Sequence, residues 1–281
     1  MNRSDADIQN ILAAFRAPDR NAYPELLGYS RDDLYRDFFG GGGLYLAVHM
    51  LRTLHLRPGQ VVLDLGCGKG ETSIFMARHY GVQVKALDLW TSADFLAQKF
   101  SARGYGDRIS AVQMDATQPL PYARNEFDAI FCMNSFNFYG TAPAFLEHLL
   151  QHLKPGGWLC IGSEALSVEF TPEQIHNPPG VYAFKLPPPN EHVDVFADDF
   201  SKQHTPNWWR NHLQASGLLE VETCHELQDA DLLYEELVRY EHEHHLDPFD
   251  VQICLDQIEW GRTHQPRKTL FVVTARKLPN G

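Results

Sequence analysis

Hydrophobic residues along this chain of 281 residues occur in two kinds of pattern, and segments of one kind alternate with segments of the other. From residue 58 onward, short continuous apolar runs alternate with stretches whose apolar residues recur at helical spacing. The apolar runs predict strands at 60–65, 82–87, 108–113, 127–132 and 157–162. The stretches between them predict helices near 70–80, 92–103 and 142–153. Such alternation is typical of a parallel sheet covered by helices on both faces.

The flanking segments follow other patterns. Residues 5–17 predict an amphipathic helix behind a Ser4 or Asp5 cap. Residues 40–43 are four glycines, which mark a flexible or closely approached loop, and 44–55 predicts a further helix. Residues 165–206 contain proline clusters and predict a long loop. The core pattern then returns with a helix at 207–216, a strand at 218–226, mostly helix over 229–260 and a last strand over 269–275.

Composition narrows the class of partner. Apolar residues make up 44% of the chain, which is enough for a sizeable core, and acidic residues outnumber basic ones 36 to 24. The resulting formal charge of −12 repels a phosphate backbone and an anionic membrane surface. We therefore expect neither nucleic acid nor stable membrane association. A neutral or cationic small molecule suits this charge better, although surface acidity more often serves solubility.

The five cysteines are widely spaced and include no CxxC pair. Buried free thiols in a reducing compartment explain them better than disulfides or zinc. The first residues lack the apolar run of a signal peptide, and no 18 uncharged apolar residues occur together. These features predict a cytoplasmic protein.

One apolar strand runs directly into a glycine-rich turn. Residues 64–70 read Asp-Leu-Gly-Cys-Gly-Lys-Gly, and a predicted helix follows. Glycines permit a sharp turn and close approach to a ligand, and the helix N-terminus favours an anionic ligand group. The dinucleotide fingerprint is GxGxxG, but here Gly70 arrives one residue early and Glu71 follows. An acid there is a poor neighbour for a pyrophosphate and is tolerable beside the amino-acid end of S-adenosylmethionine. The spacing therefore favours S-adenosylmethionine over NAD.

Polar residues end the next strands as well. Asp88 closes the second strand, 18 residues beyond Gly70, where a ribose diol would lie. Asp115 closes the third strand within reach of an adenine amino group, and Asn134 follows the fourth. Helix capping can explain each acid singly. It does not explain the ordered set at one edge of the sheet.

With these residues, the chain resembles the class I S-adenosylmethionine-dependent methyltransferases, over 59–164 and again over 208–275. The resemblance implies an α/β, Rossmann-like seven-stranded mixed sheet with helices on both faces and the last strand antiparallel, so that 269–275 inserts beside 218–226. By position it assigns the methionine part to the glycine turn, the ribose to Asp88 and the adenine to the residues around it and to Asp115. The implied cofactor-binding residues are Asp64, Gly66, Cys67, Gly68, Gly70, Asp88, Leu89, Trp90, Asp115, Ala116 and Asn134.

Segments 41–44, 88–90, 134–139 and 204–209 are also similar to uncharacterised bacterial small-molecule methyltransferases of the cyclopropane-fatty-acid-synthase-like group. We accordingly expect four parts. They are an N-terminal helical lid segment over 1–57, an S-adenosylmethionine-binding core over 58–164, a loop insertion over the site in 165–206, and the remaining core over 207–281 with a helical insertion near 229–262.

The acceptor side of the site is less defined. Polar residues flank the strand ends there. A residue in such a place more often lines the pocket or packs against neighbouring side chains than acts as a general base. Glu164, at the end of the fifth strand, His204, just before Trp208 and Trp209, and Tyr139 are the predicted catalytic residues. The two tryptophans could form a face for a cationic acceptor, or pack a helix onto the sheet.

The cluster of His242, His244 and His245 lacks HExxH spacing, and a solvated helix face explains it better than a metal site. We therefore expect no metal. The favoured function is methyl transfer from S-adenosylmethionine to a small-molecule acceptor by in-line displacement. Whether N, O, S or carbon is methylated stays open, as does the oligomeric state. The alternatives are a nicotinamide-dependent oxidoreductase and a non-catalytic cofactor-binding protein.

Overall fold

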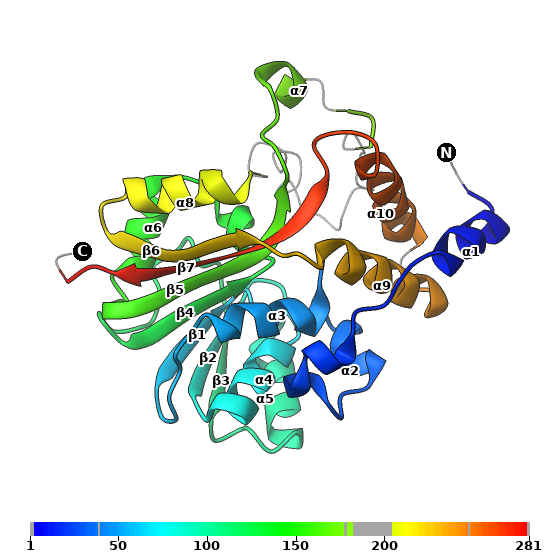
Figure 1. Ribbon diagram of the computed structural model, residues 1–281. Helices are drawn as coiled ribbons and strands as arrows, with labels where there is room; N and C mark the ends of the chain where they lie inside the picture. Colours follow the sequence, from blue (N-terminus) through cyan, green and yellow to red (C-terminus); the bar gives the residue numbers. More distant parts are fainter. Residues whose placement is uncertain (1–2, 39, 177–178, 182–203, 247, 280–281) are drawn as a thin grey trace.

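A seven-stranded sheet runs through the centre of the chain, with helices on both faces (Figure 1). The computed structural model describes residues 3–38, 40–176, 179–181, 204–246 and 248–279. The strands are β1 (Val61–Leu65), β2 (Gln83–Asp88), β3 (Ile109–Gln113), β4 (Phe127–Met133), β5 (Leu153–Leu166), β6 (Leu219–Glu226) and β7 (Lys268–Lys277).

The strand order is β3-β2-β1-β4-β5-β7-β6. The first five strands pair in parallel, and β7 pairs antiparallel with both β5 and β6. This arrangement confirms the expected mixed sheet in which the last strand inserts beside the sixth. The strand order reverses between β1 and β4, and open α/β sheets bind ligands at the carboxyl ends of the strands beside such a switch point.

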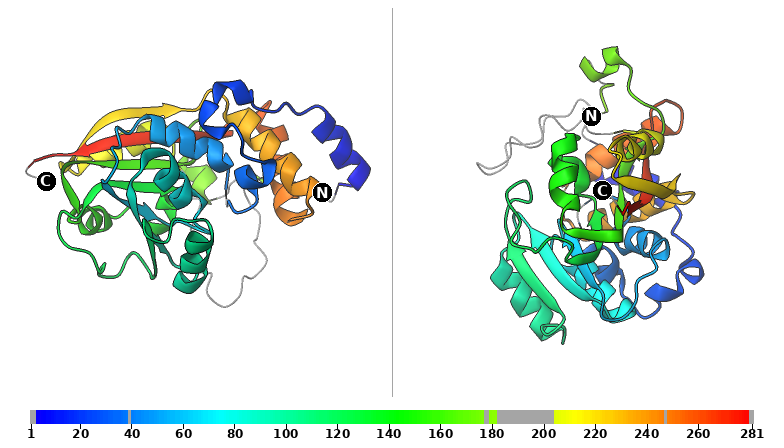
Figure 2. Two further views of the ribbon diagram at one scale, coloured as in Figure 1. Left: turned by 90° about the horizontal axis from the view of Figure 1, so that it is seen from below. Right: turned by 90° about the vertical axis from the view of Figure 1, so that its left-hand side faces the viewer.

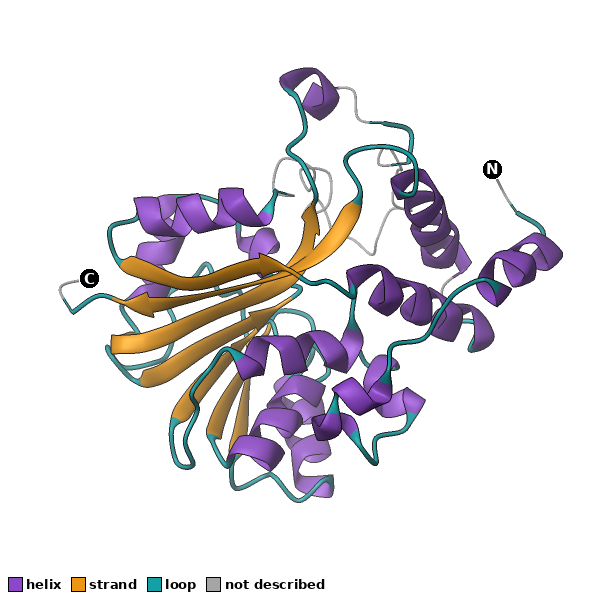
Figure 3. Ribbon diagram, in the orientation of Figure 1, coloured by secondary structure: helices purple, strands orange, loops and turns teal. Residues whose placement is uncertain are grey.

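Figure 3 shows that some helices cover the faces of the sheet and that others lie beyond the ends of the strands. They are α1 (Asp5–Ala13), α2 (Arg31–Tyr35), α3 (Gly43–Arg52), α4 (Glu71–Tyr80), α5 (Ala93–Ala102), α6 (Pro143–Leu150), α7 (Pro172–His176), α8 (Pro206–Ala215), α9 (Ala230–Glu243) and α10 (Pro248–Gly261), with 3-10 turns at Arg20–Ala22, Pro24–Leu26 and Phe136–Tyr139. None of the described helices is both long and apolar enough to cross a membrane.

Alternating strand residues feed two separate cores. In β1, Val62 packs with α3, α4 and α5, whereas Leu63 packs on the opposite face with α6 and α8. Successive strand side chains point to opposite faces, so continuous apolar strands supply both cores. Figure 2 shows the helices on the two sides of the sheet.

The N-terminal segment lies beside the last two helices (Figures 1 and 2). Leu12 and Phe15 form an apolar cluster with Val238 of α9 and Val251 of α10. Arg3 adds an ion pair to α10 through Glu259, at 2.7 Å. The N-terminal segment, α9 and α10 therefore form one packed layer at the carboxyl edge of the sheet.

Three details differ from the expectations. The strand expected over 157–162 is longer in the structure, because β5 begins at Leu153 and passes through an irregularity in its pairing with β4. Helix α2 was not predicted because its five residues are too few to show periodicity; a capping box between Ser30 and Asp33 begins it. The expected 165–206 loop contains α7, and residues 177–178 and 182–203 lie outside the described residues.

Candidate functional site

The glycine turn connects β1 to α4 at the switch point of the sheet. Gly66 and Gly70 have φ values of +72° and +85°, in the left-handed region that favours glycine. A Cβ on Gly66 would lie 2.3 Å from the Oγ of Ser135, and one on Gly70 would lie 2.6 Å from the ring of Phe100. Both glycines are therefore required by backbone conformation and by close packing. Cys67, between them, is buried, and burial raises the pKa of its thiol well above the usual value.

Asp64 connects β1 to the first turn of α4. It is 1% exposed and accepts hydrogen bonds from the hydroxyls of Thr72 and Ser73, both at 2.6 Å. Burial raises the pKa of Asp64 to about 6, against the lowering effect of these two hydroxyls. The structure thus gives Asp64 a structural function beneath the turn, and its predicted contact to the methionine part stays a prediction.

Asp88 organises both loops that flank the end of β2. One oxygen accepts the backbone N–H of Gly68 at 2.9 Å, and the other accepts the N–H groups of Trp90 and Thr91 at 2.9 and 2.8 Å. A carboxylate can accept about four hydrogen bonds, so one site is left for a further donor. The acid that the sequence places at a ribose diol therefore also holds the glycine turn in shape.

Apolar and acidic groups continue along this edge. Leu89 and Trp90 are 44% and 50% exposed, although both are large hydrophobic residues. Ala116 is buried. Asp115 accepts the N–H and hydroxyl of Thr117 at 2.8 and 2.7 Å; burial raises its pKa, but these hydrogen bonds outweigh burial and hold it below the usual range. The edge thus presents an apolar surface beside an ionised carboxylate.

Glu71 was expected to present its negative charge to the ligand, but in the structure this charge is paired with cations of the protein. Its carboxylate forms an ion pair with Lys99 at 2.8 Å and lies 3.9 Å from Arg103. The negative charge is therefore compensated by cations of α5. The glycine spacing therefore disfavours a pyrophosphate, whereas Glu71 does not.

Asn134 connects β4 to the glycine run of the N-terminal segment. Its φ is +53°, a strained conformation for a residue other than glycine, and its amide donates to the carbonyl of Gly41 at 3.0 Å. Gly41, Gly42 and Gly43 are buried, and a Cβ on Gly41 would lie 2.7 Å from the ring of Tyr234. The glycine run is thus a closely packed segment at the carboxyl edge. Of the two possibilities that the sequence left open, a flexible loop or a closely approached one, the structure shows the second.

Glu164 lies two residues before the end of β5 and is held by several partners. It accepts the N–H of Gly41 at 3.2 Å and forms an ion pair with Lys268 at 2.6 Å. Burial raises the pKa of Glu164, but Lys268 and a hydrogen bond from Tyr234 outweigh burial and hold it below the usual value. A carboxylate with a lowered pKa is a weak proton acceptor, so this geometry favours a positioning function over the predicted basic one.

Tyr139 lies over the glycine turn. Its ring stacks on Phe145 with centroids 4.9 Å apart, and its hydroxyl would be 3.1 Å from a Cβ on Gly66. Burial raises the pKa of Tyr139 well above its usual value, against a hydrogen bond with the Ser135 side chain that lowers it. The phenol therefore stays protonated at neutral pH and can act there only as a hydrogen-bond partner.

The third predicted catalytic residue, His204, has a carboxylate and an aromatic ring as direct neighbours. Its Nδ1 lies 2.8 Å from a carboxylate oxygen of Glu169, and its ring stacks on Trp208 with centroids 3.6 Å apart. The other oxygen of Glu169 accepts the N–H and hydroxyl of Thr205, which caps α8. Sequence reasoning missed Glu169, since only the fold brings it across 35 residues to His204.

The two tryptophans of α8 have different surroundings. Trp209 is buried and stacks on Phe271 of β7, which confirms that at least one of them packs the helix onto the sheet. Trp208 is half-buried between two imidazoles, with His212 stacked on it at a centroid distance of 4.8 Å. A face of Trp208 for a cationic acceptor stays a prediction.

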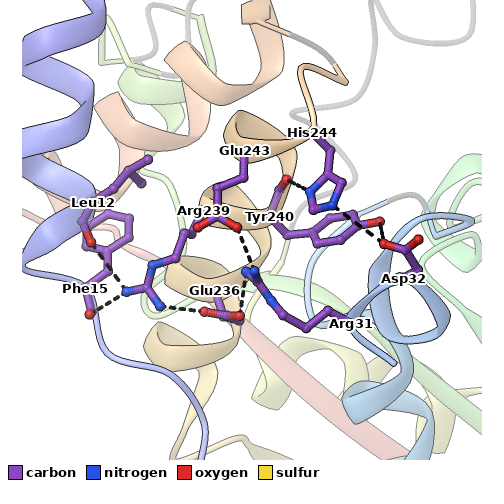
Figure 4. Close-up of polar contacts among 9 residues, drawn as sticks. All are labelled: Leu12, Phe15, Arg31, Asp32, Glu236, Arg239, Tyr240, Glu243 and His244. Atoms are coloured by element: carbon purple, nitrogen blue, oxygen red, sulfur yellow. Dashed lines mark hydrogen bonds and ion pairs between the residues drawn. The ribbon is translucent and has the colours of Figure 1, made fainter. Parts of the chain in front are cut away.

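The histidine cluster at the end of α9 belongs to a polar layer that joins α9 to the N-terminal segment (Figure 4). His244 stacks on Tyr240 at a centroid distance of 4.0 Å and lies 3.6 Å from Asp32. Arg31 forms ion pairs with Glu236 and Glu243, at 2.8 and 2.6 Å. Within the described ranges, no group of three or more histidine, cysteine or acidic side chains is arranged to hold a metal ion. All five cysteines lie in the described ranges, and none of them forms a disulfide.

Comparison with known proteins agrees with this geometry. Residues 62–157 match the family described as methyltransferase domain. Phosphoethanolamine N-methyltransferase 3 of Arabidopsis thaliana is 32% identical over 124 residues, which is 44% of this chain and 25% of that protein. The chain spans less than half the length of the curated relatives it matches.

Solved structures share the fold at low identity. Phosphoethanolamine N-methyltransferase 2 of Haemonchus contortus, in complex with phosphomonomethylethanolamine and S-adenosylhomocysteine, superposes with a TM-score of 0.68 at 16% identity, covering 92% of this chain and 59% of that one. The [4+2]-cyclase SpnF superposes with a TM-score of 0.62 at 20% identity, covering 83% and 80%.

The sheet order, the glycine turn at its switch point and the matched family together define the class. The chain carries a class I S-adenosylmethionine-dependent methyltransferase domain, and its match to the family extends from β1 to the start of β5. The finer grouping with the cyclopropane-fatty-acid-synthase-like proteins stays a prediction. The likeness to a cyclase shows that this fold alone does not decide the reaction, so the whole chain's activity is argued from the site.

Proposed function

We propose that this protein binds S-adenosylmethionine at the carboxyl edge of β1, β2 and β3 and transfers its methyl group to a small-molecule acceptor. The observation that carries the proposal is the set formed by the glycine turn, the carboxylate of Asp88 and the exposed apolar side chains of Leu89 and Trp90. Bound S-adenosylmethionine supplies an electrophilic methyl group on a sulfonium.

The residues suit that ligand group by group. Asp88 keeps one acceptor site after its three backbone contacts, which suits a ribose hydroxyl. Leu89 and Trp90 supply an apolar surface for adenine, and Asp115 and Ala116 follow at the next strand end. The turn at Gly66 and Gly68, with Asp64 beneath it, suits the methionine part. Asn134 would lie near the sulfonium.

In the reaction, the bond from sulfur to the methyl carbon breaks as the bond from the acceptor atom to that carbon forms, and S-adenosylhomocysteine is released. Such in-line displacement depends mainly on positioning and on exclusion of water. A hydroxyl or ammonium acceptor must also lose a proton. We propose that His204 takes this proton, since Glu169 holds its Nδ1 and Trp208 fixes its ring, which leaves Nε2 as the proton acceptor. Tyr139 and Glu164 then position the acceptor and the N-terminal segment.

We propose that the parts of the chain divide this function along the bounds expected from the sequence. Residues 1–57 and the helical insertion near 229–262 pack on one another and would cover the cofactor core of 58–164. The loop insertion expected over 165–206 lies mostly outside the described residues. Residues 207–281 supply the last two strands of the sheet.

The strongly negative composition favours a small molecule over nucleic acid. Five cysteines without a disulfide support a cytoplasmic location.

The acceptor chemistry is tested by a panel of amines, alcohols and thiols, with release of S-adenosylhomocysteine as the readout. With the best acceptor, His204→Ala should lower kcat about 100-fold or more, because a positioned proton acceptor contributes roughly 10²–10⁴ in rate. Glu169→Gln should lower kcat by about tenfold, because the imidazole loses its orienting carboxylate. His212→Ala is the matched control, since His212 stacks on the same tryptophan without contacting Glu169. If His204→Ala keeps the wild-type kcat, His204 is not the base.

A further inference from the structure

The carboxylate of Asp37 joins the N-terminal segment to the glycine turn. Asp37, two residues after α2, lies 3.2 Å from the Nζ of Lys69 and 2.7 Å from the Nζ of Lys99. Lys69 lies inside the glycine turn, and Lys99 lies in α5. The Asp37 side chain is 26% exposed and that of Lys99 is 14% exposed, so water screens these pairs only in part. Neither lysine was singled out by the sequence.

Lys99 has three polar contacts at this place. It donates hydrogen bonds to Asp37 and to the backbone carbonyl of Lys69, the latter at 2.8 Å, and it forms an ion pair with Glu71 at 2.8 Å. Because Lys99 binds the Lys69 carbonyl, its position fixes the orientation of a peptide group within the glycine turn.

The same segment is anchored again on the far side of the turn. Gly41, four residues after Asp37, donates to Glu164 and accepts from Asn134, at 3.2 and 3.0 Å. The segment therefore has one fixed point on the glycine turn and a second on the ends of β4 and β5. Burial raises the pKa of Asp37, but Lys99 and Lys69 outweigh it and hold the pKa below the usual value, so the carboxylate is ionised at neutral pH.

We propose that Asp37 is a positioning residue for cofactor binding: through Lys69 and Lys99 it holds the glycine turn in its binding conformation and couples the N-terminal segment to release of the product S-adenosylhomocysteine. The inference rests on the proposed function, because it assigns the glycine turn to this ligand. It adds the ion pairs of Asp37, which have to weaken before the ligand can dissociate. Because salt screens ion pairs, the rate of dissociation depends on ionic strength.

The test measures dissociation of S-adenosylhomocysteine from the 281-residue protein by stopped flow, at 0.05 and 0.5 M NaCl. Asp37→Asn should raise the dissociation rate about tenfold, which corresponds to roughly 1.4 kcal/mol, because the glycine turn loses charge-assisted hydrogen bonds to a largely buried carboxylate. The wild-type rate should rise with salt, whereas the Asp37→Asn rate should be nearly independent of salt. Asp37→Glu, which keeps the charge, should recover most of the wild-type rate.

Asp128→Asn is the matched control. Asp128 bridges Lys154 and the N–H of Val61, at 2.8 and 2.9 Å, at the opposite edge of the sheet, so its loss should leave the dissociation rate and its salt dependence unchanged. The proposal is overturned if Asp37→Asn dissociates at the wild-type rate, or if Asp128→Asn accelerates release equally. If the wild-type protein does not bind S-adenosylhomocysteine at all, the assignment of the ligand fails first, and this inference fails with it.

Discussion

Replacement of Asp88 by asparagine should weaken binding of S-adenosylmethionine about 100-fold or more. Three backbone N–H groups point at the carboxylate, from Gly68, Trp90 and Thr91. An asparagine offers one acceptor oxygen and turns its NH₂ group toward one of these donors, so at least one loop has to move. Each lost hydrogen bond to a charged group is worth about 1.5–3 kcal/mol, and two of them suffice for a 100-fold change.

Titration calorimetry with S-adenosylmethionine measures this effect directly. Asp94→Asn is the matched control, since Asp94 is an exposed acid in the first turn of α5, six residues further along the chain. It should bind with wild-type affinity. Wild-type affinity in Asp88→Asn would contradict both the ribose contact and the organising function of this carboxylate.

Replacement of Gly66 by alanine should have an effect of similar size on binding and a clear effect on stability. The residue has φ +72°, which costs a non-glycine residue about 1–2 kcal/mol. Its new Cβ would lie 2.3 Å from the Oγ of Ser135, which is itself held by a hydrogen bond to the Leu65 carbonyl at 2.9 Å. Either β1 or the β4 loop must therefore shift. We expect a loss of about 2–4 kcal/mol in the free energy of unfolding, and loss of measurable cofactor binding.

Gly59→Ala separates backbone strain from the clash. Gly59 has φ +84°, and a Cβ there would meet nothing within 4 Å. This variant should lose only about 1–2 kcal/mol and bind S-adenosylmethionine normally. Denaturant unfolding and calorimetry on both variants make the comparison. Equal losses in the two variants would show that the packing of Ser135 against the turn is unimportant.

Most of the sheet could be predicted because each buried strand carries a local signal. Val62 and Leu63 enter opposite cores, so β1 reads as one continuous apolar run. Helix α2 could not be predicted, since five residues are too few to show helical spacing and much of its stability comes from packing of Leu34 and Tyr35 in the core. The insertion of β7 beside β6 was expected from the resemblance alone, because strand order is set by long-range pairing.

The cofactor half of the site could be placed because strand ends and a glycine turn are adjacent in sequence. The surroundings of the acceptor candidates could not. Glu164 is paired with Lys268 across 104 residues, and His204 meets Glu169 across 35. The first contact makes Glu164 a weak proton acceptor, and the second orients the imidazole of His204. Neither contact could be predicted from sequence spacing, because the fold brings together residues that lie far apart in the chain.

The proposed function requires that the glycine turn binds S-adenosylmethionine and not a dinucleotide. Titration calorimetry of the wild-type protein with S-adenosylmethionine, S-adenosylhomocysteine and NADH distinguishes the two ligand classes. We expect saturable 1:1 binding of the first two ligands and no heat of binding for NADH. Binding of NADH without binding of either sulfur ligand would overturn the assignment of this site.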